Sequence, residues 1–333
     1  TLDIKISPRN LFWLSVSPNS ISLYSYKNNK FLAKYALTNE QIQKFGFFTQ
    51  STWVSDNHFA LLLSDGFVFL FSLTESFIRL ENIFDSDPSS TRLSISSFNE
   101  YVVCTDDNGF LLFFSTDYQK GQNIKIQITN FPIKRIYFTS SFKNQQYGVI
   151  LSADGRSFSF EINLSMIHQG ASQFILKPMT DSRVISVALS KRNIAASFKV
   201  NNMISIVDVS SHNDPIDLKA KFASRAILCF ADDMTLFIIY MNGTISVWNY
   251  MQRVTHTFKF PDLINSHCAS ISGQYLYASN ETGIFVLPIF SLYYSEFPLL
   301  LGPSTVVEFR AVKNGAVHLD YDLSQYEESI CSV

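Results

Sequence analysis

Stretches of apolar residues alternate with short polar turns along the chain, in a pattern that recurs seven times. Each repeat consists of two apolar runs joined by a turn of Asn, Asp, Ser or Gly, as in FALLLSDGFVFLF (59–71) and LFIIYMNGTISVW (236–248). Two such runs around a turn that tolerates positive φ predict a β-hairpin. The turn residues are Asn19, Gly66, Gly109, Gly155, Asn202, Gly243 and Gly283, so consecutive turns are 47, 43, 46, 47, 41 and 40 residues apart.

The residues between consecutive hairpins leave room for two further strands in each repeat. Residues 45–56 and 225–233 predict a strand before a hairpin, and residues 76–84 and 253–260 predict a strand after one. Four strands in about 40–45 residues form the blade of a β-propeller. We therefore predict an all-β fold, a seven-bladed β-propeller with a short C-terminal extension.

The predicted propeller is a degenerate relative of the WD-repeat type. The Trp-Asp dipeptide that ends the third strand of a WD repeat is absent, and only Trp248 occupies the Trp position. Glycine is scarce, 12 of 333 residues, so Asn and Asp form several turns in its place, because Asn adopts the left-handed conformation next best after Gly. The positions that we expect to define the fold are Trp53, Gly66, Gly109, Gly155, Gly243, Trp248 and Gly283.

The regular spacing ends after Leu301, so we predict a propeller over residues 1–301 and a separate segment over 302–333. That segment contains one more hairpin signal (305–321) around Asn314-Gly315, followed by a polar tail. The hairpin either completes the ring or begins a following domain. We favour a following domain, because seven hairpins already fill the ring. The first residue is Thr, so we also expect the natural N-terminus to lie upstream.

Composition favours a folded module that binds other proteins. Charged residues are only 16% of the chain, and 26 basic against 28 acidic residues give a net charge of −2. This balance gives no reason to expect a nucleic-acid partner. A surface with so little charge commonly exposes apolar patches, and such patches mark partner contacts. The most apolar stretch (284–301) contains two prolines and Glu296, so it is a poor membrane span. We expect a soluble protein, with its four cysteines reduced in the cytosol.

The sequence lacks the motifs of known catalytic, nucleotide-binding and metal sites, so we predict no enzyme, no catalytic residue, no cofactor and no metal ligand. His212 and Asp214 lie in a polar loop, which favours a solvated turn over a metal site. His267 and Cys268 are neighbours in a predicted strand and should point to opposite faces, which disfavours a nucleophile–base pair. The run Asp106–Gly109 is explained as a hairpin turn and lacks the ligand pattern of a calcium loop.

Two basic pairs, Lys134-Arg135 and Lys191-Arg192, occupy similar places in neighbouring repeats. They either form a modest patch for an anionic lipid or acidic partner, or are scattered solvated charges, which is the interpretation we favour. Three Asn-x-Ser/Thr triplets (Asn163, Asn242 and Asn280) fall in or near turns, and without a secretory signal they predict no glycosylation.

Two stretches of the chain resemble the ribosome control protein one family. The first, residues 21–73, matches through Phe45-Gly46, Gln50, Trp53, Asp56, Ala60 and Gly66, and the second, residues 227–258, through Gly243, Ser246 and Trp248. The segment 297–310 is also similar to the region after the propeller in that family. The detailed similarity covers about a quarter of the chain.

This resemblance implies a function in membrane traffic. Members of the family form the large propeller-bearing subunit of a heterodimeric guanine-nucleotide exchange factor. Their partner subunit has an arrestin-like fold, and the pair activates the Golgi Rab GTPase of the Rab-six class in retrograde vesicle transport. The implied role is a non-catalytic scaffold that is cytoplasmic and peripheral on the Golgi membrane. The resemblance carries over no catalytic residue.

Two other functions stay open. Some propellers are enzymes that use polar side chains converging on the ring axis, although no His, Asp or Glu recurs in register across these repeats. Alternatively, the chain is a scaffold subunit of another vesicle-tethering, coat or pore complex. Such subunits share the degenerate propeller, so only the two stretches named above separate them from the exchange-factor family.

Overall fold

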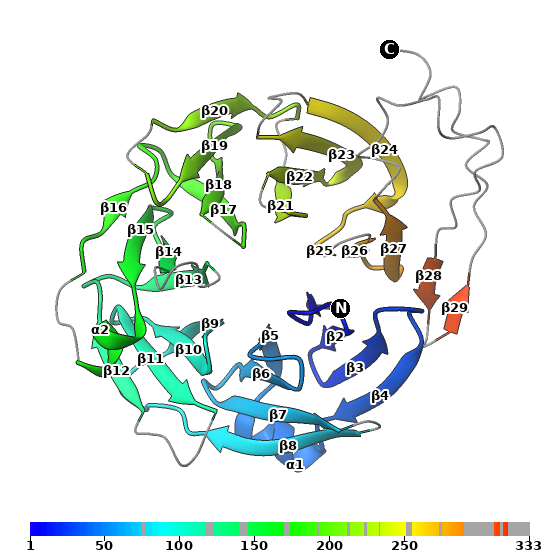
Figure 1. Ribbon diagram of the computed structural model, residues 1–333. Helices are drawn as coiled ribbons and strands as arrows, with labels where there is room; N and C mark the ends of the chain where they lie inside the picture. The colour runs from blue at the N-terminus through cyan, green and yellow to red at the C-terminus, as the bar shows by residue number, and fades with distance from the viewer. Residues whose placement is uncertain are drawn as a thin grey trace.

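Seven β-sheets are arranged as blades around a central axis in the computed structural model (Figure 1). The structure describes residues 1–74, 77–116, 123–139, 146–169, 174–191, 193–211, 214–222, 225–232, 234–250, 255–272, 275–289, 310–313 and 316–318. In each blade consecutive strands pair antiparallel in chain order, with the first strand nearest the axis. The predicted seven-bladed, WD-repeat-like propeller is confirmed.

Four consecutive strands form each of the first four blades. Blade 1 contains β1 (Asp3–Ile6), β2 (Phe12–Ser17), β3 (Ser20–Ser25) and β4 (Phe31–Ala36). Blade 2 contains β5 (Phe48–Trp53), β6 (His58–Leu63), β7 (Val68–Thr74) and β8 (Phe77–Phe84). Blade 3 contains β9 (Arg92–Phe98), β10 (Tyr101–Asp106), β11 (Phe110–Ser115) and β12 (Ile124–Gln127). Blade 4 contains β13 (Ile133–Phe138), β14 (Gln146–Ser152), β15 (Ser157–Ile162) and β16 (Lys177–Pro178).

The last three blades follow the same plan, with one addition. Blade 5 contains β17 (Val184–Leu189), β18 (Ile194–Lys199), β19 (Met203–Asp208) and β20 (Ile216–Lys219). Blade 6 contains β21 (Ala226–Phe230), β22 (Thr235–Tyr240), β23 (Asn242–Asn249) and β24 (Thr255–Ile264). Blade 7 contains β25 (Cys268–Ser272), β26 (Tyr275–Ser279), β27 (Ile284–Pro288), β28 (Arg310–Lys313) and β29 (Ala316–His318).

The seven predicted hairpins are the second and third strands of the seven blades. These strands are almost continuously buried, as in β6, β22 and β18, because neighbouring blades cover both of their faces. Gly66, Gly109, Gly155, Gly243 and Asn202 have positive φ in their turns, as expected. Asn19 and Gly283 do not; in blade 7 the side chain of Asn280 organises the turn instead, by accepting hydrogen bonds from the backbone of Thr282 and Gly283.

Two short helices lie between strands and were not predicted. Helix α1 (Asn39–Phe45) connects blades 1 and 2, and α2 (Leu164–His168) follows β15. The first turn of α1 is fixed by a capping box, in which the Thr38 side chain accepts from the Gln41 backbone and the Gln41 side chain accepts from the Thr38 backbone. Phe45 is the buried residue of this helix, and Gly46 ends it with a φ of 78°. No helix among the described residues is long and apolar enough to cross a membrane.

The segment Asp85–Ser90, which connects blades 2 and 3, is organised by hydrogen bonds. The Asp87 carboxylate accepts from the backbone and hydroxyl of Ser89 and pairs with Lys125 at 3.2 Å. These bonds hold the pKa of Asp87 well below its usual range. The Arg92 side chain donates to the carbonyl oxygens of Gly66 and Asp85 and so ties the segment to blade 2.

The ring closes where blade 7 meets blade 1, through side chains. A cluster of apolar side chains joins the two blades; its buried members are Ile4, Trp13, Tyr24, Tyr277, Ile284 and Val286. Trp13 stacks on Tyr24 with ring centroids 4.0 Å apart. The amide oxygen of buried Asn29 accepts hydrogen bonds from the Trp13 indole at 3.1 Å and the Tyr277 hydroxyl at 3.2 Å. One polar atom therefore satisfies a donor from each of the two blades.

The hairpin predicted near the C-terminus is present as β28 and β29, and β28 pairs with β27 along the outer side of blade 7. Residues 290–309 and 319–333 lie outside the described residues. The boundary expected at residue 301 and the separate domain expected beyond it stay predictions.

Substitution of Gly109 by Ala should destabilise the ring far more than the same change at Gly66. Both residues have φ above 80°, which costs Ala about 1 kcal/mol. A Cβ on Gly109 would also overlap the side-chain and carbonyl oxygens of Thr129, whereas one on Gly66 would lie 3.4 Å from Ser86. We expect a loss of about 3 kcal/mol for Gly109→Ala against about 1 kcal/mol for Gly66→Ala, measured by chemical denaturation. Equal losses would show that the Thr129 contact relaxes freely.

Substitution of Asn29 by Gly should weaken ring closure. Glycine accepts the φ of 53° at this position without strain, so the change isolates the loss of the shared acceptor. Two buried donors then lack a partner, which costs about 2–3 kcal/mol. Tyr277→Phe removes one donor together with its bond and should cost about 1 kcal/mol. Thermal unfolding of both variants checks this order, and a larger effect of Tyr277→Phe would contradict it.

Candidate functional site

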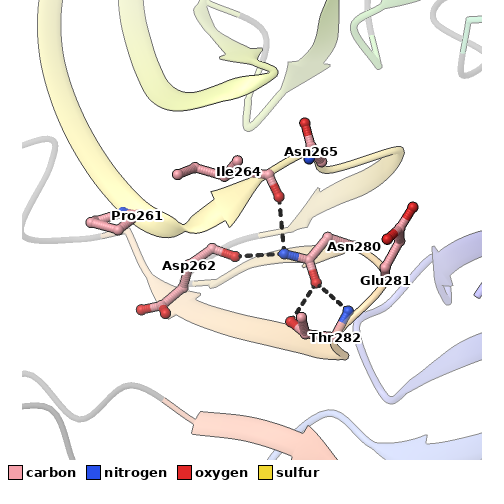
Figure 2. A pocket seen from close by; sticks show the side chains of 7 residues that line it. All are labelled: Pro261, Asp262, Ile264, Asn265, Asn280, Glu281 and Thr282. Carbon is pink, nitrogen blue, oxygen red and sulfur yellow. Dashed lines mark hydrogen bonds between the residues drawn. The ribbon is translucent and has the colours of Figure 1, made fainter.

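A shallow pocket of about 290 Å³ lies between blades 6 and 7. Figure 2 shows its lining residues, Pro261, Asp262, Ile264, Asn265, Asn280, Glu281 and Thr282. The pocket lies on the face of the ring that carries the connections from one blade to the next and the turns between second and third strands. We call this side the connector face.

The polar centre of this pocket is a structural clasp. The Asn280 amide donates to the carbonyl oxygens of Asp262 at 2.9 Å and Ile264 at 3.0 Å. Its oxygen accepts from the backbone and hydroxyl of Thr282 (Figure 2). Both donors and the acceptor of Asn280 are therefore used within the protein, where they join the end of β24 to the turn of blade 7. The groups that the clasp leaves for an incoming ligand are the carboxylates of Asp262 and Glu281, the side chain of Asn265 and the exposed face of Ile264.

The innermost strands form a second candidate site, at the ring axis (Figure 1). In four consecutive blades the first strand has a bulge at its second residue, which is Thr49, Leu93, Lys134 or Ile185. A bulge re-aims side chains and bends its strand. In blade 4 it leaves Lys134 exposed at the connector-face end of β13, with Arg135 and Tyr137 half-buried along the same strand.

Asp3 and Lys5 are the charged pair of β1. The Lys5 ammonium lies 3.6 Å from one Asp3 oxygen, and the other Asp3 oxygen accepts from the backbone and hydroxyl of Ser51 on blade 2. The Lys5 side chain is 44% exposed, although it is on an innermost strand. The carboxylate thus links two blades and orients the lysine.

Lys5 is electrostatically coupled to residues on the far side of the ring. The Asp3 charge raises the pKa of Lys5 against the opposing effect of burial, and Arg135 on β13 lowers it. Burial raises the pKa of Tyr137, while the charges of Arg135 and Lys5 act in the opposite direction. Blades 1 and 4 therefore bring charged and polar groups near one another at the axis. We call Asp3, Lys5, Arg135 and Tyr137 the axis cluster.

The basic pairs of the sequence do not form one patch. Lys134-Arg135 lies at the start of an innermost strand, and Lys191 lies in the turn that follows the next one, β17. Innermost strands cross the ring from one face to the other, so these residues are at opposite faces. Arg192 lies outside the described residues. The idea of a patch shared by the two pairs is wrong, because Lys134 and Lys191 lie at opposite faces of the ring.

His267 and Cys268 were expected to point apart, but both contact one hydroxyl. His267 lies just before β25, and its Nε2 is 3.1 Å from the Ser279 hydroxyl, while the Cys268 thiol is 3.1 Å from the same oxygen. Ser279 is fully buried and burial raises the pKa of Cys268, so the thiol is held protonated. This arrangement is a structural network between neighbouring strands. His212 lies outside the described residues.

The remaining candidate residues have structural roles. Asp106 accepts hydrogen bonds from the backbone of Asn108 and Phe110, which confirms that 106–109 is a hairpin turn. The three Asn of the Asn-x-Ser/Thr triplets all accept hydrogen bonds from nearby backbone: Asn163 caps α2, and Asn242 and Asn280 fix turns. Within the described ranges, no group of three His, Cys, Asp or Glu side chains could hold a metal ion.

Large apolar side chains are exposed on both faces of the ring. On the connector face Leu2, Phe47 and Ile264 are more than two-fifths exposed, and they precede the first strands of blades 1, 2 and 7, which are neighbours. On the opposite face lie Leu11, Phe31 and Phe77. This weakly charged protein therefore exposes apolar side chains around blades 7, 1 and 2, and such side chains are suited to contacts with a partner.

The buried cysteines should be inert in the native protein. Burial raises the pKa of Cys104 and Cys229 to about 12, and only the thiolate reacts with alkylating reagents. At pH 8 about one thiol in ten thousand is then ionised, against about one in ten at a pKa of 9. We expect iodoacetamide to label both residues only after denaturation, as measured residue by residue with mass spectrometry. Rapid labelling of either in the native protein would contradict the burial.

Comparison with known proteins identifies the architecture. No family model matches the chain, and no curated protein matches it. Among solved structures it is similar to Sqt1 of Saccharomyces cerevisiae, with a TM-score of 0.61 and 11% sequence identity over 96% of this chain and 95% of that one. At this identity the likeness shows the fold alone. In all, 1623 chains of solved structures match this chain. The chain is a seven-bladed, WD-repeat-like β-propeller, a fold that does not by itself assign a function.

Proposed function

We propose that this chain is a non-catalytic propeller scaffold in a Rab guanine-nucleotide exchange complex that acts in retrograde vesicle transport at the Golgi. The observation that carries the proposal is the resemblance to the ribosome control protein one family over residues 21–73 and 227–258. Its partners would be an arrestin-like subunit and a Golgi Rab GTPase of the Rab-six class. The protein would be cytoplasmic and peripheral on the Golgi membrane.

The residues that carry the resemblance fix the relative positions of blades 1, 2 and 3. Gln50 donates to the Leu93 carbonyl of blade 3 at 2.8 Å, and Asp56 accepts from the Arg9 backbone of blade 1 at 2.9 Å. Gly66 provides the carbonyl that receives Arg92. These three matching positions therefore help to set how blades 1, 2 and 3 sit side by side, which supports a shared ring geometry in this part of the chain.

The exchange reaction suits a protein without acid–base chemistry. A factor releases nucleotide by binding the nucleotide-free GTPase more tightly than the nucleotide-bound form, and this shifts a population without any bond being made or broken. A closed ring presents preformed surfaces, which limits the entropy lost on binding. Exposed apolar side chains on both faces near blades 1 and 2 offer separate surfaces for two partners.

Phe47 is the exposed side chain that best marks the contact with the partner subunit. It is 47% exposed, lies within the first resembling stretch, and belongs to the connector-face set formed with Leu2 and Ile264. Phe77 on the opposite face is more exposed, at 71%, and lies outside both resembling stretches. These two residues form a matched pair for testing which face the partner binds.

Nucleotide release from the Rab should require the complete complex. We expect no stimulated release by this chain alone and strong release by the chain assembled with its arrestin-like subunit, measured with a fluorescent guanine nucleotide. Phe47→Ser should weaken assembly by about tenfold, because an apolar anchor at an interface contributes about 1.4 kcal/mol or more. Phe77→Ser should leave assembly unchanged.

Several outcomes would contradict this proposal. Stimulated release by the isolated chain would refute the scaffold role, and absence of release by the complete complex would refute the family assignment. If affinity purification of the full-length protein recovers a vesicle-tethering, coat or pore complex in place of an arrestin-like subunit, the alternative scaffold function is correct. If Phe77→Ser, and not Phe47→Ser, blocks assembly, the partner binds the opposite face.

A further inference from the structure

Basic and apolar side chains are exposed together on the face of the ring opposite the connector face. In blade 1 the turn between β1 and β2 contains Leu11, which is 50% exposed. The turn between β3 and β4 contains exposed Lys27 and Lys30 and is followed by Phe31, which is 41% exposed. In blade 2, Phe77 begins β8 and is 71% exposed. We call these five residues the basic–apolar patch.

Contacts within the protein hold the parts of this patch together. The Tyr26 backbone donates a hydrogen bond to the Leu11 carbonyl at 3.0 Å, which joins the two turns of blade 1. The Tyr24 ring packs edge-on against Phe31, with ring centroids 5.8 Å apart. Phe31 and Phe77 are the first residues of β4 and β8, the outermost strands of blades 1 and 2, which lie side by side (Figure 1). The patch is therefore one preformed surface that extends over two blades.

The two lysines give the patch a net positive charge. The nearby acidic groups already have partners, because Asp56 lies 3.5 Å from the Arg9 guanidinium and Glu81 lies 3.5 Å from the His58 ring. In the part of the chain that the structure describes, no carboxylate forms an ion pair with either lysine of the patch. Two unpaired cations thus stand beside three exposed apolar side chains, in a protein whose overall charge is −2.

We propose that the basic–apolar patch binds the surface of an anionic lipid membrane. Lys27 and Lys30 contact the headgroups as mobile point charges, which suit the diffuse negative charge of a membrane. The three apolar side chains of the patch enter the boundary between headgroups and acyl chains. There they leave water without the need for a shaped pocket.

The arrangement of the patch favours a membrane over an acidic protein. All five residues belong to turns or strand starts on one face of the ring, so one broad surface can reach them together. Carboxylates of a protein are best recognised by the paired donors of arginine, and the Arg9 guanidinium beside these turns is already engaged by Asp56. A membrane on this side leaves the connector face, with Phe47, turned away from the lipid and available to a protein partner.

This inference names a surface for the peripheral membrane location in the proposed function, and it rests on that proposal only for the identity of the membrane. Vesicle binding is measured without the partner subunit and without the GTPase. Its absence would therefore leave the exchange-factor proposal standing, and failure of the exchange assay would leave vesicle binding unaffected.

The test is co-sedimentation of the purified chain with phosphatidylcholine vesicles and with vesicles that contain about one third phosphatidylserine. We expect binding to the anionic vesicles alone, and it should weaken as salt is added, because ions screen the attraction. Lys27→Gln/Lys30→Gln should weaken this binding by about tenfold or more. Lys177→Gln/Lys219→Gln removes the same charge from the outermost strands of blades 4 and 5, and it should bind as the parent does.

A second variant tests the apolar half of the patch. Leu11→Ser should weaken binding to the anionic vesicles by about threefold to tenfold. It should keep the salt dependence of the parent, whereas the variant without the two lysines should lose most of it. The matched control is Val200→Ser in the turn between β18 and β19 on the connector face, where the residue is 60% exposed, and this variant should bind as the parent does.

Three results would overturn the proposal. The first is binding by the parent chain to neither kind of vesicle, or to both equally. The second is equal binding by the two double lysine variants. The third is binding of a soluble polyglutamate peptide as tight as that of the anionic vesicles and abolished by Lys27→Gln/Lys30→Gln, which would make the patch a site for an acidic protein segment.

Discussion

The contact between blade 7 and blade 1 is the constraint on which the ring depends. Each blade buries both faces of its middle strands only because it has a neighbour on either side, so an open ring would expose one face of blade 1 and one face of blade 7. Within the described strands, every blade is built from consecutive strands, and none is shared between the chain start and blade 7. Closure therefore rests on side chains, chiefly the stacked Trp13 and Tyr24 and the shared acceptor Asn29.

This closure explains the unusual backbone of Asn29. The residue has a left-handed φ of 53° and is almost completely buried. A glycine would adopt this conformation with less strain, but it has no side chain to accept from Trp13 and Tyr277. The two requirements, positive φ and a buried amide oxygen, are met together by asparagine. Other turns of the chain also have Asn where Gly is more usual. At position 29 the reason is specific, because the amide side chain is needed as a buried acceptor.

Local patterns predicted the blades well because each blade is a local structure. Strands that follow one another in sequence also pair in space, so the apolar runs and the turn residues carried the information for all seven hairpins. Trp53 and Trp248, chosen as fold-defining, are both buried. Helix α1 was missed although its Thr38–Gln41 capping box is visible in the sequence, because seven residues show too little periodicity to stand out among strands.

The contacts between distant parts of the chain left no such pattern. Asn29 and Tyr277 are 248 residues apart, and no spacing in the sequence links them. The axis cluster joins residues near the chain start to residues of blade 4, because the ring brings the innermost strands together. The basic pairs also could not be placed from sequence. Their similar positions in neighbouring repeats did not reveal that Lys134 lies near the start of β13 whereas Lys191 lies in the turn after β17, at the opposite face of the ring.

The geometry of the ring also determines where its few charges can act. Space narrows towards the axis, and the first strands there are rich in small residues, such as the three serines of β9 and two of β25, whereas the phenylalanines fill the wider space between middle strands. Few long side chains fit at the axis, so each one that is present has a large influence on the local potential.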